Sequence, residues 1–437
     1  MEWWQALSLM IGGLIALLAI GVPVAFAFFA INIVGALIFL GGDAGLTQMV
    51  RNAATSVTSF ALVPIPLFLL MGEILFHTGL AARAIDAVDR LITRLPGRLS
   101  LVAICGGTFF AALSGSSMAN TAMLGSTLMP EMRRRGYHPT MAMGPILGTG
   151  GIAILIPPSG LAVLLGSLAQ ISISDLLIGG ILPGLLIAVL FFIYVIVRCT
   201  INPNLAPSYP VERLGLWQRW RPFFVNVLPL LVIFIAVVGS MLGGLATASE
   251  SAALGAFASL VAAACYGKLT WRALYVSLYE TGKISAMIFL IAAASLTFSQ
   301  ILSFSGATQG FLAGVGDLAS SPFVLLLAML ALLLLLGCFM DPLSIMMITL
   351  PFFMPLIRTA GIDQVWFGIM MLLCLEIGFL TPPFGMLLFV MKGVAPKETT
   401  MWEIIVAAVP FVLLQIVALA MIFVAPGIVT WLPSLSR

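Results

Sequence analysis

Long apolar runs with almost no charge occupy the chain from end to end, and they leave few folds open. Of the 437 residues, 62% are hydrophobic and only 8% are charged. A water-soluble domain usually carries about 25% charged residues, and no soluble fold of this length could bury so much apolar surface. The runs are continuous, whereas a membrane barrel would alternate over roughly ten residues. The sequence therefore predicts an all-α polytopic membrane protein.

Apolar runs of about 20 residues predict membrane spans, and shorter or interrupted runs predict half-spans. Residues 7–40 predict two short spans that turn at Gly21-Val22-Pro23, with one long tilted helix as the alternative. The first half continues with a span at 55–75, an amphipathic interfacial stretch at 81–94, an apolar stretch 99–130 interrupted at Ser114-Gly115-Ser116-Ser117, a broken segment 143–170 and a span at 174–197. The second half shows the same order, at 223–241, 245–266, 282–303, 308–319, 322–357 interrupted at Asp341-Pro342, 365–394 and 402–425.

The positive charges favour a re-entrant hairpin in each half. If the N-terminus is outside and each half crosses five times, nearly all Lys and Arg residues fall on the cytoplasmic side, as the positive-inside rule requires. Only Arg51, Arg358 and Arg437 fall outside. A full crossing at 99–136 would put several basic clusters on the wrong side. Each interrupted stretch is therefore expected to return to the side from which it entered.

A nearly constant spacing relates the two halves. Pro157-Pro158 recurs 225 residues later as Pro382-Pro383, and Met129-Pro130 recurs at the same distance as Met354-Pro355. An odd number of crossings in each half would turn the second half upside down relative to the first. The sequence therefore predicts two inverted repeats of about five spans, each with a hairpin and a broken helix. In secondary transporters with this architecture, the binding site lies at the repeat interface near the midplane. Plain symmetry in a channel is the alternative.

The polar hairpin tips and the Pro-Pro breaks are the expected binding site. Irregular backbone at membrane depth is tolerated only where it is buried in protein or lines a wet cavity. Pro and Gly free backbone carbonyls, which with Ser, Thr and Asn oxygens suit Na⁺, and the N-termini of half-helices suit a carboxylate. The tips contain Ser114 to Thr121 and Gly337 to Ser344, and the breaks contain Gly148 to Gly160 and Glu376 to Gly385.

Structural explanations compete with each of these interpretations. The small residues at 114–117 could simply allow close helix packing, and the Pro-Pro pairs could be kinks. Asp341 could bind an ion or cap the helix that starts at Pro342, and the two roles are compatible. Glu250 is expected to be structural. An enzyme is not expected, because both histidines lie near predicted span ends, Asp341 is the lone deep aspartate and no phosphate-binding loop is present.

The chain resembles the large membrane subunit of a tripartite ATP-independent periplasmic (TRAP) transporter over essentially its whole length. One departure is Ala248, where the family often has Pro. The motifs that carry the resemblance are Gly21–Phe26, Pro64–Phe68 before Gly72-Glu73, Ser114–Asn120, Ile154–Gly160, Gly244–Ala256, Gly337–Pro342 with Pro351 and Pro355, and Leu380–Gly385.

The resemblance implies Na⁺-coupled uptake of an organic acid across the bacterial inner membrane, with an elevator-type transport domain moving against a scaffold. It also implies two protein partners, a small four-span membrane subunit and a periplasmic substrate-binding protein, and no nucleic acid. The Na⁺ residues that it implies are Ser116, Ser117, Asn120, Gly148, Thr149, Pro157, Gly337, Asp341, Thr381 and Pro382. The substrate is expected at Ser114, Ser116, Ser159, Thr381 and Pro383.

The expected division follows the two repeats. Scaffold spans are expected at 1–75 and at 171–305 with the repeat junction, the transport domain at 76–170 and 306–394, and the final span at 395–437. A divalent-anion symporter without a binding protein and a passive channel are the alternatives. The substrate itself and the half that holds the ion stay open, and no arginine is identified that would clamp a carboxylate.

Overall fold

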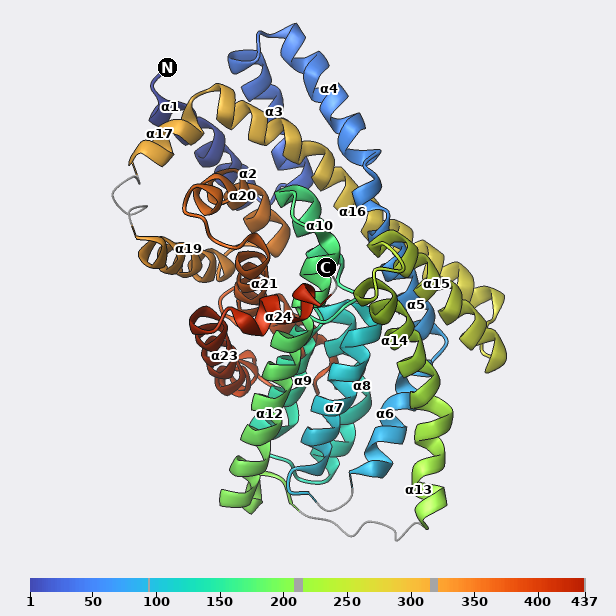
Figure 1. Ribbon diagram of the computed structural model, residues 1–437. Coiled ribbons are helices and arrows are strands. Elements are labelled where there is room, and N and C mark those ends of the chain that lie inside the picture. The colour runs from blue at the N-terminus through green and yellow to red at the C-terminus, as the bar shows by residue number, and fades with distance from the viewer. Residues whose placement is uncertain (93–94, 208–214, 315–320, 436–437) are drawn as a thin grey trace.

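The computed structural model describes residues 1–92, 95–207, 215–314 and 321–435, and within these ranges the regular structure is entirely helical. Figure 1 shows the helices from the N-terminus in blue to the C-terminus in red. The all-α prediction is thus confirmed. The charge distribution in the sequence puts Arg94 and Arg213 on the cytoplasmic side of the membrane and Arg437 on the outer side. All three lie outside the described residues.

The helices of the first half begin with a short α1, a π-helical turn and α2, and the chain then turns at Gly21–Pro23 before α3. Two short helices are therefore correct, and the single long helix is wrong. The elements are α1 (Trp3–Leu7), η1 (Ser8–Gly12), α2 (Gly13–Ala19), α3 (Val24–Phe39), α4 (Asp43–Val57), η2 (Phe60–Leu62), α5 (Pro64–His77), α6 (Leu80–Leu91), α7 (Arg98–Ser114), α8 (Ser117–Arg134), α9 (Pro139–Ile152), α10 (Gly160–Ala169), α11 (Ile173–Gly179) and α12 (Ile181–Ile201).

The second half repeats this order of hairpin, broken helix and long span. Its elements are η3 (Pro203–Leu205), α13 (Leu216–Pro222), η4 (Phe223–Val227), α14 (Leu228–Leu242), α15 (Ala248–Cys265), α16 (Trp271–Phe304), α17 (Ala307–Gly314), α19 (Pro322–Gly337), α20 (Pro342–Thr359), α21 (Gln364–Leu380), α22 (Met386–Val394), α23 (Met401–Val424) and α24 (Gly427–Ser434). The expected amphipathic stretch at 308–319 lies partly outside the described residues.

Two predicted span boundaries are wrong. The span expected at 55–75 is divided, because α4 ends at Val57 and α5 starts only at Pro64. Pro64 fits the first turn of a helix, where its missing N–H costs nothing, but it cannot continue α4. The span expected at 282–303 instead begins at Trp271, because the Thr270 hydroxyl caps α16 by accepting a hydrogen bond from the Ala273 amide at 3.1 Å.

Seven helical segments are long and apolar enough to cross a membrane, judged by length and composition among the described residues. Shorter apolar helices accompany them, including α3, the hairpin helices α7 and α19, and α10 and α21 in the broken segments. Both interrupted stretches are helical pairs, and in each pair the two helices pack against each other. The recurrence of this order fits a duplication, while the inverted orientation of the two halves stays a prediction.

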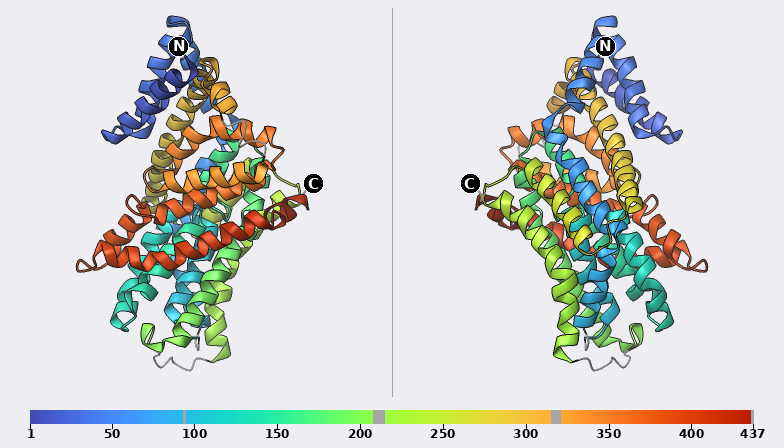
Figure 2. Two further views of the ribbon diagram at one scale, coloured as in Figure 1. Left: turned by 90° about the vertical axis from the view of Figure 1, so that its left-hand side faces the viewer. Right: turned by 90° about the vertical axis from the view of Figure 1, so that its right-hand side faces the viewer.

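The helices pack in two groups. In one, the long α16 contacts α3, α4 and α5, and α15 packs against α5 and α14. In the other, α9 packs against α7, α8 and α23, while α21 packs against α19, α20 and α23. Figure 1 shows α7, α8, α9 and α12 running side by side, and Figure 2 shows α23 crossing the molecule obliquely. Broken helices from both halves thus meet around α23.

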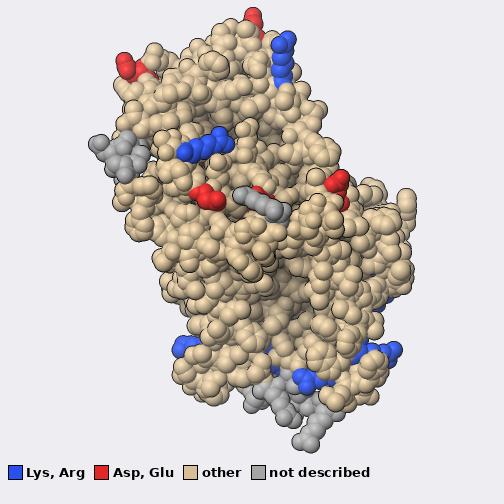
Figure 3. Space-filling view, viewed as in Figure 1, with Lys and Arg blue, Asp and Glu red and all other residues tan. Residues whose placement is uncertain are grey.

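Charged side chains leave a broad band of one face of the molecule free. Figure 3 shows Lys and Arg mostly at the lower end of the visible face, Asp and Glu in its upper part, and a broad uncharged band between them. One ion pair joins the ends of two helices, α6 and α7, where Arg98 Nη2 lies 2.8 Å from Asp89 Oδ2. Burial raises the pKa of the Asp89 carboxyl more than Arg98 lowers it. This distribution fits a protein surrounded by lipid.

Candidate ion and substrate site

The tip of the first hairpin is a tight turn between α7 and α8. Gly115 has a φ of 60° and ends α7 in the left-handed region. A Cβ at this position would collide with the carbonyl oxygen of Pro158, so only glycine lets the tip approach the first Pro-Pro break so closely. Ser116 then starts α8, with its hydroxyl accepting a hydrogen bond from the Ala119 amide at 3.3 Å.

The break between α9 and α10 is buried along its whole length. Residues 153–159 leave the α-helix, and the Pro157-Pro158 peptide bond is cis. The Ser159 hydroxyl starts the next helix by accepting a hydrogen bond from the Ala162 amide at 3.2 Å. Helices α8 and α10 thus both begin with a capping serine, and two of the four predicted serines, Ser116 and Ser159, accept hydrogen bonds from backbone N–H groups.

Asn120 joins the first hairpin to the first broken helix. Its side-chain nitrogen donates to the carbonyl of Gly107 at 3.1 Å and to that of Thr149 at 2.9 Å. The residue is completely buried, and its Oδ1 has no hydrogen-bond partner among the described residues. The Thr149 hydroxyl donates a hydrogen bond to the carbonyl of Pro145, one turn earlier in α9, at 2.6 Å. Asn120 therefore connects α7, α8 and α9 and leaves one amide oxygen available.

A second orphaned oxygen lies on the same face of α8 as Asn120. Ser117, Asn120 and Thr121 occupy one face of α8, because residues three and four apart are neighbours on a helix. The Thr121 hydroxyl lies against the backbone of Gly150 and has no partner among the described residues. An unpaired buried oxygen costs free energy unless a ligand or water satisfies it. The orphaned oxygens therefore fit a site that binds something.

Glu376 brings a carboxylate from the second half of the chain to this cluster. It comes from α21, is completely buried, and one of its oxygens lies against the backbone of Gly151. Its Oε2 accepts a hydrogen bond from the Ser117 hydroxyl at 3.5 Å, while Oε1 has no partner among the described residues. A buried carboxylate with one weak hydrogen bond is costly unless a cation or a proton accompanies it.

The second hairpin tip is built around Asp341, which caps α20. Its Oδ2 accepts hydrogen bonds from the Leu343 amide at 3.0 Å and the Ser344 amide at 3.1 Å, and its Oδ1 accepts from the Ser344 hydroxyl. The capping role considered from the sequence is thus confirmed. Asp341 is half-buried, so its carboxylate remains open to a further ligand.

The second tip touches the second broken helix through backbone. A Cβ on Gly337 would lie 2.9 Å from the Cα of Gly378, so the two glycines let α19 and α21 meet closely. The Phe384 amide donates to the Cys338 carbonyl at 3.3 Å. Thr381 donates its hydroxyl to the Ile377 carbonyl at 2.7 Å, and the cis pair Pro382-Pro383 is exposed.

The predicted residues therefore fall into two groups, which we call half-sites. Gly148 belongs to the first by position, although its backbone lies against the rings of Phe411 and Phe191. The first half-site contains Ser114, Ser116, Ser117, Asn120, Gly148, Thr149, Pro157 and Ser159, and the second contains Gly337, Asp341, Thr381, Pro382 and Pro383.

Thr121 and Glu376 stand inside the motifs expected to form the site, but neither is among the residues expected to bind the ion or the substrate. The signal for Glu376 was an acid within an apolar run, which is a reason to expect a function. The apolar pattern of the α21 sequence gave no sign that the Glu376 side chain would contact residues of the first half-site. Thr121 stands within the tip motif, four residues after Ser117.

Comparisons with known proteins agree with this architecture. The family model described as "Tripartite ATP-independent periplasmic transporter, DctM component" matches residues 11–428. The ectoine TRAP transporter large permease protein TeaC of Halomonas elongata is 29% identical over 431 residues, covering 98% of this chain and 99% of that protein. The C4-dicarboxylate TRAP transporter large permease protein DctM of Pseudomonas aeruginosa is 32% identical over 378 residues, covering 86% of each.

A solved structure shares the fold. The crystal structure of the Alcanivorax borkumensis YdaH transporter superposes with a TM-score of 0.60 and covers 88% of this chain and 89% of that one. The two chains are 16% identical, so this likeness concerns the fold alone.

Proposed function

This chain belongs to the family of large membrane subunits of tripartite ATP-independent periplasmic (TRAP) transporters, and we propose that it couples Na⁺ entry to the uptake of a small organic acid. As a member of that family it is a multi-pass transporter subunit. The observation that carries the coupling proposal is the set of orphaned buried oxygens on Asn120, Thr121 and Glu376.

Sodium fits the chemistry of these donors. Na⁺ is a hard cation that prefers oxygen ligands, and the cluster offers an amide oxygen, hydroxyl oxygens and one carboxylate. The Glu376 carboxylate offsets the free-energy cost of burying a cation, and the cation offsets the cost of burying this carboxylate. In this proposal Ser116, Ser117, Asn120, Thr149 and the carbonyls of Gly148 and Pro157 serve the first half-site. Gly337, Asp341, Thr381 and Pro382 serve the second.

The substrate is proposed to be a small carboxylate. Names of relatives include C4-dicarboxylate and ectoine as transported solutes. Helices α8 and α10 begin at the capped residues Ser116 and Ser159, and their N-terminal dipole ends attract negative charge. Together with Ser114, Thr381 and Pro383, these ends are the proposed contacts for the carboxylate. A bound cation nearby would strengthen this attraction, so ion and substrate would bind cooperatively.

Several further features extend the proposal from the family to this chain. The partners are a small four-span membrane subunit and a periplasmic binding protein that delivers the substrate. The chain lies in the bacterial inner membrane with its N-terminus in the periplasm. The transport domain consists of 76–170 and 306–394, and it moves in an elevator fashion against scaffold spans within 1–75 and 171–305. The two halves are inverted repeats, and 395–437 forms the last span.

Uptake into proteoliposomes tests the proposed coupling. The chain, its small subunit and its substrate-loaded binding protein are combined, and an inward Na⁺ gradient is compared with an inward K⁺ gradient of equal size. We expect accumulation with Na⁺ alone. Equal uptake under both gradients would refute sodium coupling and favour a passive route.

A further inference from the structure

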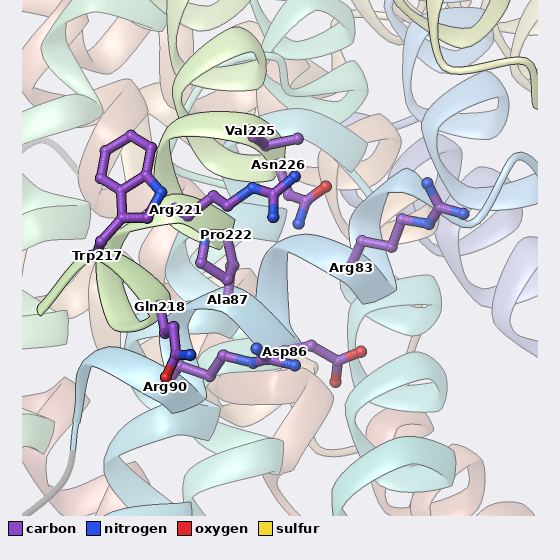
Figure 4. Close-up of a pocket in the computed structure, with 10 residues that line it drawn as sticks. All are labelled: Arg83, Asp86, Ala87, Arg90, Trp217, Gln218, Arg221, Pro222, Val225 and Asn226. Atoms are coloured by element: carbon purple, nitrogen blue, oxygen red, sulfur yellow. The ribbon is translucent and has the colours of Figure 1, made fainter. Parts of the chain in front are cut away.

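A basic cleft lies where the amphipathic helix α6 packs against α13 and the η4 turn. Its volume is about 650 Å³, and its lining includes Arg83 and Arg90 of α6 together with Trp217 and Arg221 of α13. Figure 4 shows these side chains around the cleft, with Asn226 beside Arg221. None of the residues that line this cleft belongs to either half-site.

The side chains that line this cleft carry more positive than negative charge. Arg83, Arg90 and Arg221 form no ion pair among the described residues, and Asp86 is the lone acid named in the lining. Arg83, Asp86 and Arg90 follow one another at helical spacings of three and four and so share one face of α6. Guanidinium groups bind phosphate through paired N–H donors, and three of them line this cleft.

An exposed apolar track leads away from the cleft along α14. Val225, Leu228, Val232 and Ile235 are 47%, 38%, 56% and 57% exposed. Leu228, Val232 and Ile235 follow the three-and-four spacing of a single face of α14, and Val225 precedes them in the η4 turn. A charged end joined to an apolar track of this kind matches a phospholipid, whose head group and acyl chain are joined in the same way.

Aromatic residues mark the depth of the cleft in the membrane. Trp217 is 70% exposed, Trp220 43% and Phe224 48%. Trp side chains concentrate where lipid head groups begin, and basic clusters at this level bind anionic head groups. An acidic protein segment could bind the arginines without exposed aromatic side chains at the level of the lipid head groups.

We infer that this cleft binds the phosphate head group of an anionic phospholipid, with an acyl chain lying along the α14 track. Arg83 and Arg90 hold the head group from α6, and Arg221 holds it from α13. The lipid therefore covers the contact that α6 makes with α13 and with the η4 turn before α14. Its binding is expected to stabilise this junction.

Native mass spectrometry of the detergent-purified full chain tests the inference, with phosphatidylglycerol and phosphatidylcholine as probes. The test variant combines Arg83→Gln, Arg90→Gln and Arg221→Gln. The matched control combines Arg134→Gln, Lys268→Gln and Arg272→Gln, which removes as many exposed charges elsewhere. We expect the wild type and the control to retain phosphatidylglycerol and the test variant to bind it about a hundredfold more weakly.

Thermal unfolding gives a second readout. Phosphatidylglycerol is expected to raise the midpoint of the wild type and the control, and phosphatidylcholine is not. The single variant Arg221→Gln is expected to show a smaller loss in both measurements, which keeps the test valid if the triple variant folds poorly.

Three results would overturn the lipid site. The test variant could bind phosphatidylglycerol as the control does. Inorganic phosphate alone could raise the wild-type midpoint to the same extent. Co-purification with the small membrane subunit could displace the lipid while the test variant weakens that association, which would assign the cleft to a protein partner.

Discussion

The two half-sites have similar parts but opposite exposure. At the first, the Pro-Pro break is buried, and Asn120, one turn into α8 behind the tip, is 0% exposed. At the second, Phe384 beside the Pro-Pro pair is 59% exposed and Phe339 at the tip is 58% exposed. The first tip is held by side-chain hydrogen bonds from Asn120, whereas the second is held by the Phe384 amide and by glycine-to-glycine packing.

This difference separates a preformed site from an accessible one. The first half-site keeps its orphaned oxygens away from water, and such oxygens bind a dehydrated cation well because they need little reorganisation. The second offers the Asp341 carboxylate, which caps α20, and an exposed loop. A ligand can reach both without a change in the packing of the core. Glu376 connects the two, since it lies two residues before Gly378 on the same helix.

The largest effect is expected at Asn120→Ala, which removes the link between three helices. Losing two buried hydrogen bonds and one ligand oxygen should cost about 3 kcal/mol and slow uptake about a hundredfold. Sodium-driven uptake and thermal unfolding are measured together.

Asn32→Ala is the matched control for Asn120→Ala. Asn32 is also fully buried and donates to the Ala294 carbonyl at 2.7 Å, but it joins α3 to α16 outside the half-sites. It should lower stability and leave the Na⁺ dependence intact. If both variants lose uptake in proportion to their stability, Asn120 has a structural role alone.

Two substitutions of Asp341 distinguish its role as a helix cap from its proposed role in ion binding. Asn caps a helix about as well as Asp, so Asp341→Asn should keep its thermal midpoint yet reduce uptake about tenfold, or about 1.4 kcal/mol. Asp341→Ala should reduce uptake further than Asp341→Asn does and in addition lose about 1 kcal/mol of stability with the cap. Full sodium-dependent uptake in Asp341→Ala would exclude Asp341 from the site.

Gly115→Ala tests whether the first tip must touch the Pro-Pro break. A positive φ costs alanine about 1 to 2 kcal/mol, and here the added methyl group also meets the Pro158 carbonyl. Gly361→Ala is the control, because its φ is 68° and nothing lies within 4 Å of an added Cβ. We expect greater loss of stability and uptake at Gly115. Equal losses would show that the close approach is unimportant.

The smallest effect is expected at Phe384→Ala in the second loop. Its side chain is mostly exposed, so stability should change by no more than about 0.5 kcal/mol. Ile156→Ala in the corresponding buried loop should cost about 2 to 4 kcal/mol. Chemical unfolding of the two variants is the measurement, and similar losses would contradict the contrast between the half-sites.

Much of the fold follows from the sequence, because the membrane demands continuous apolar helices. The interruptions at 114–117 and 341–342 became helix ends, since Gly115 adopts a left-handed turn and Asp341 caps α20. The duplicated Pro-Pro pairs both stand at helix breaks. These features are local, so residue identity and spacing were enough to predict them.

Features that depend on packing between distant segments were missed or displaced. Glu376 reaches the first half-site only because α21 packs against α9. Likewise, α16 is one helix of 34 residues where the first half has α4 and α5, because Pro64 divides them and α16 lacks an equivalent proline. The basic cleft between α6 and α13 joins segments more than a hundred residues apart.

The central claim is that the buried half-site, completed by Glu376, binds the coupling sodium. A sodium titration of the purified chain, read as the thermal midpoint with K⁺ holding ionic strength constant, tests it most directly. Sodium at a hundred times its dissociation constant should stabilise the wild type by about 2.7 kcal/mol. Glu376→Gln should lose most of this gain, while the exposed control Glu398→Gln should keep it. An unchanged sodium response in Glu376→Gln, or no response in the wild type, would contradict the account.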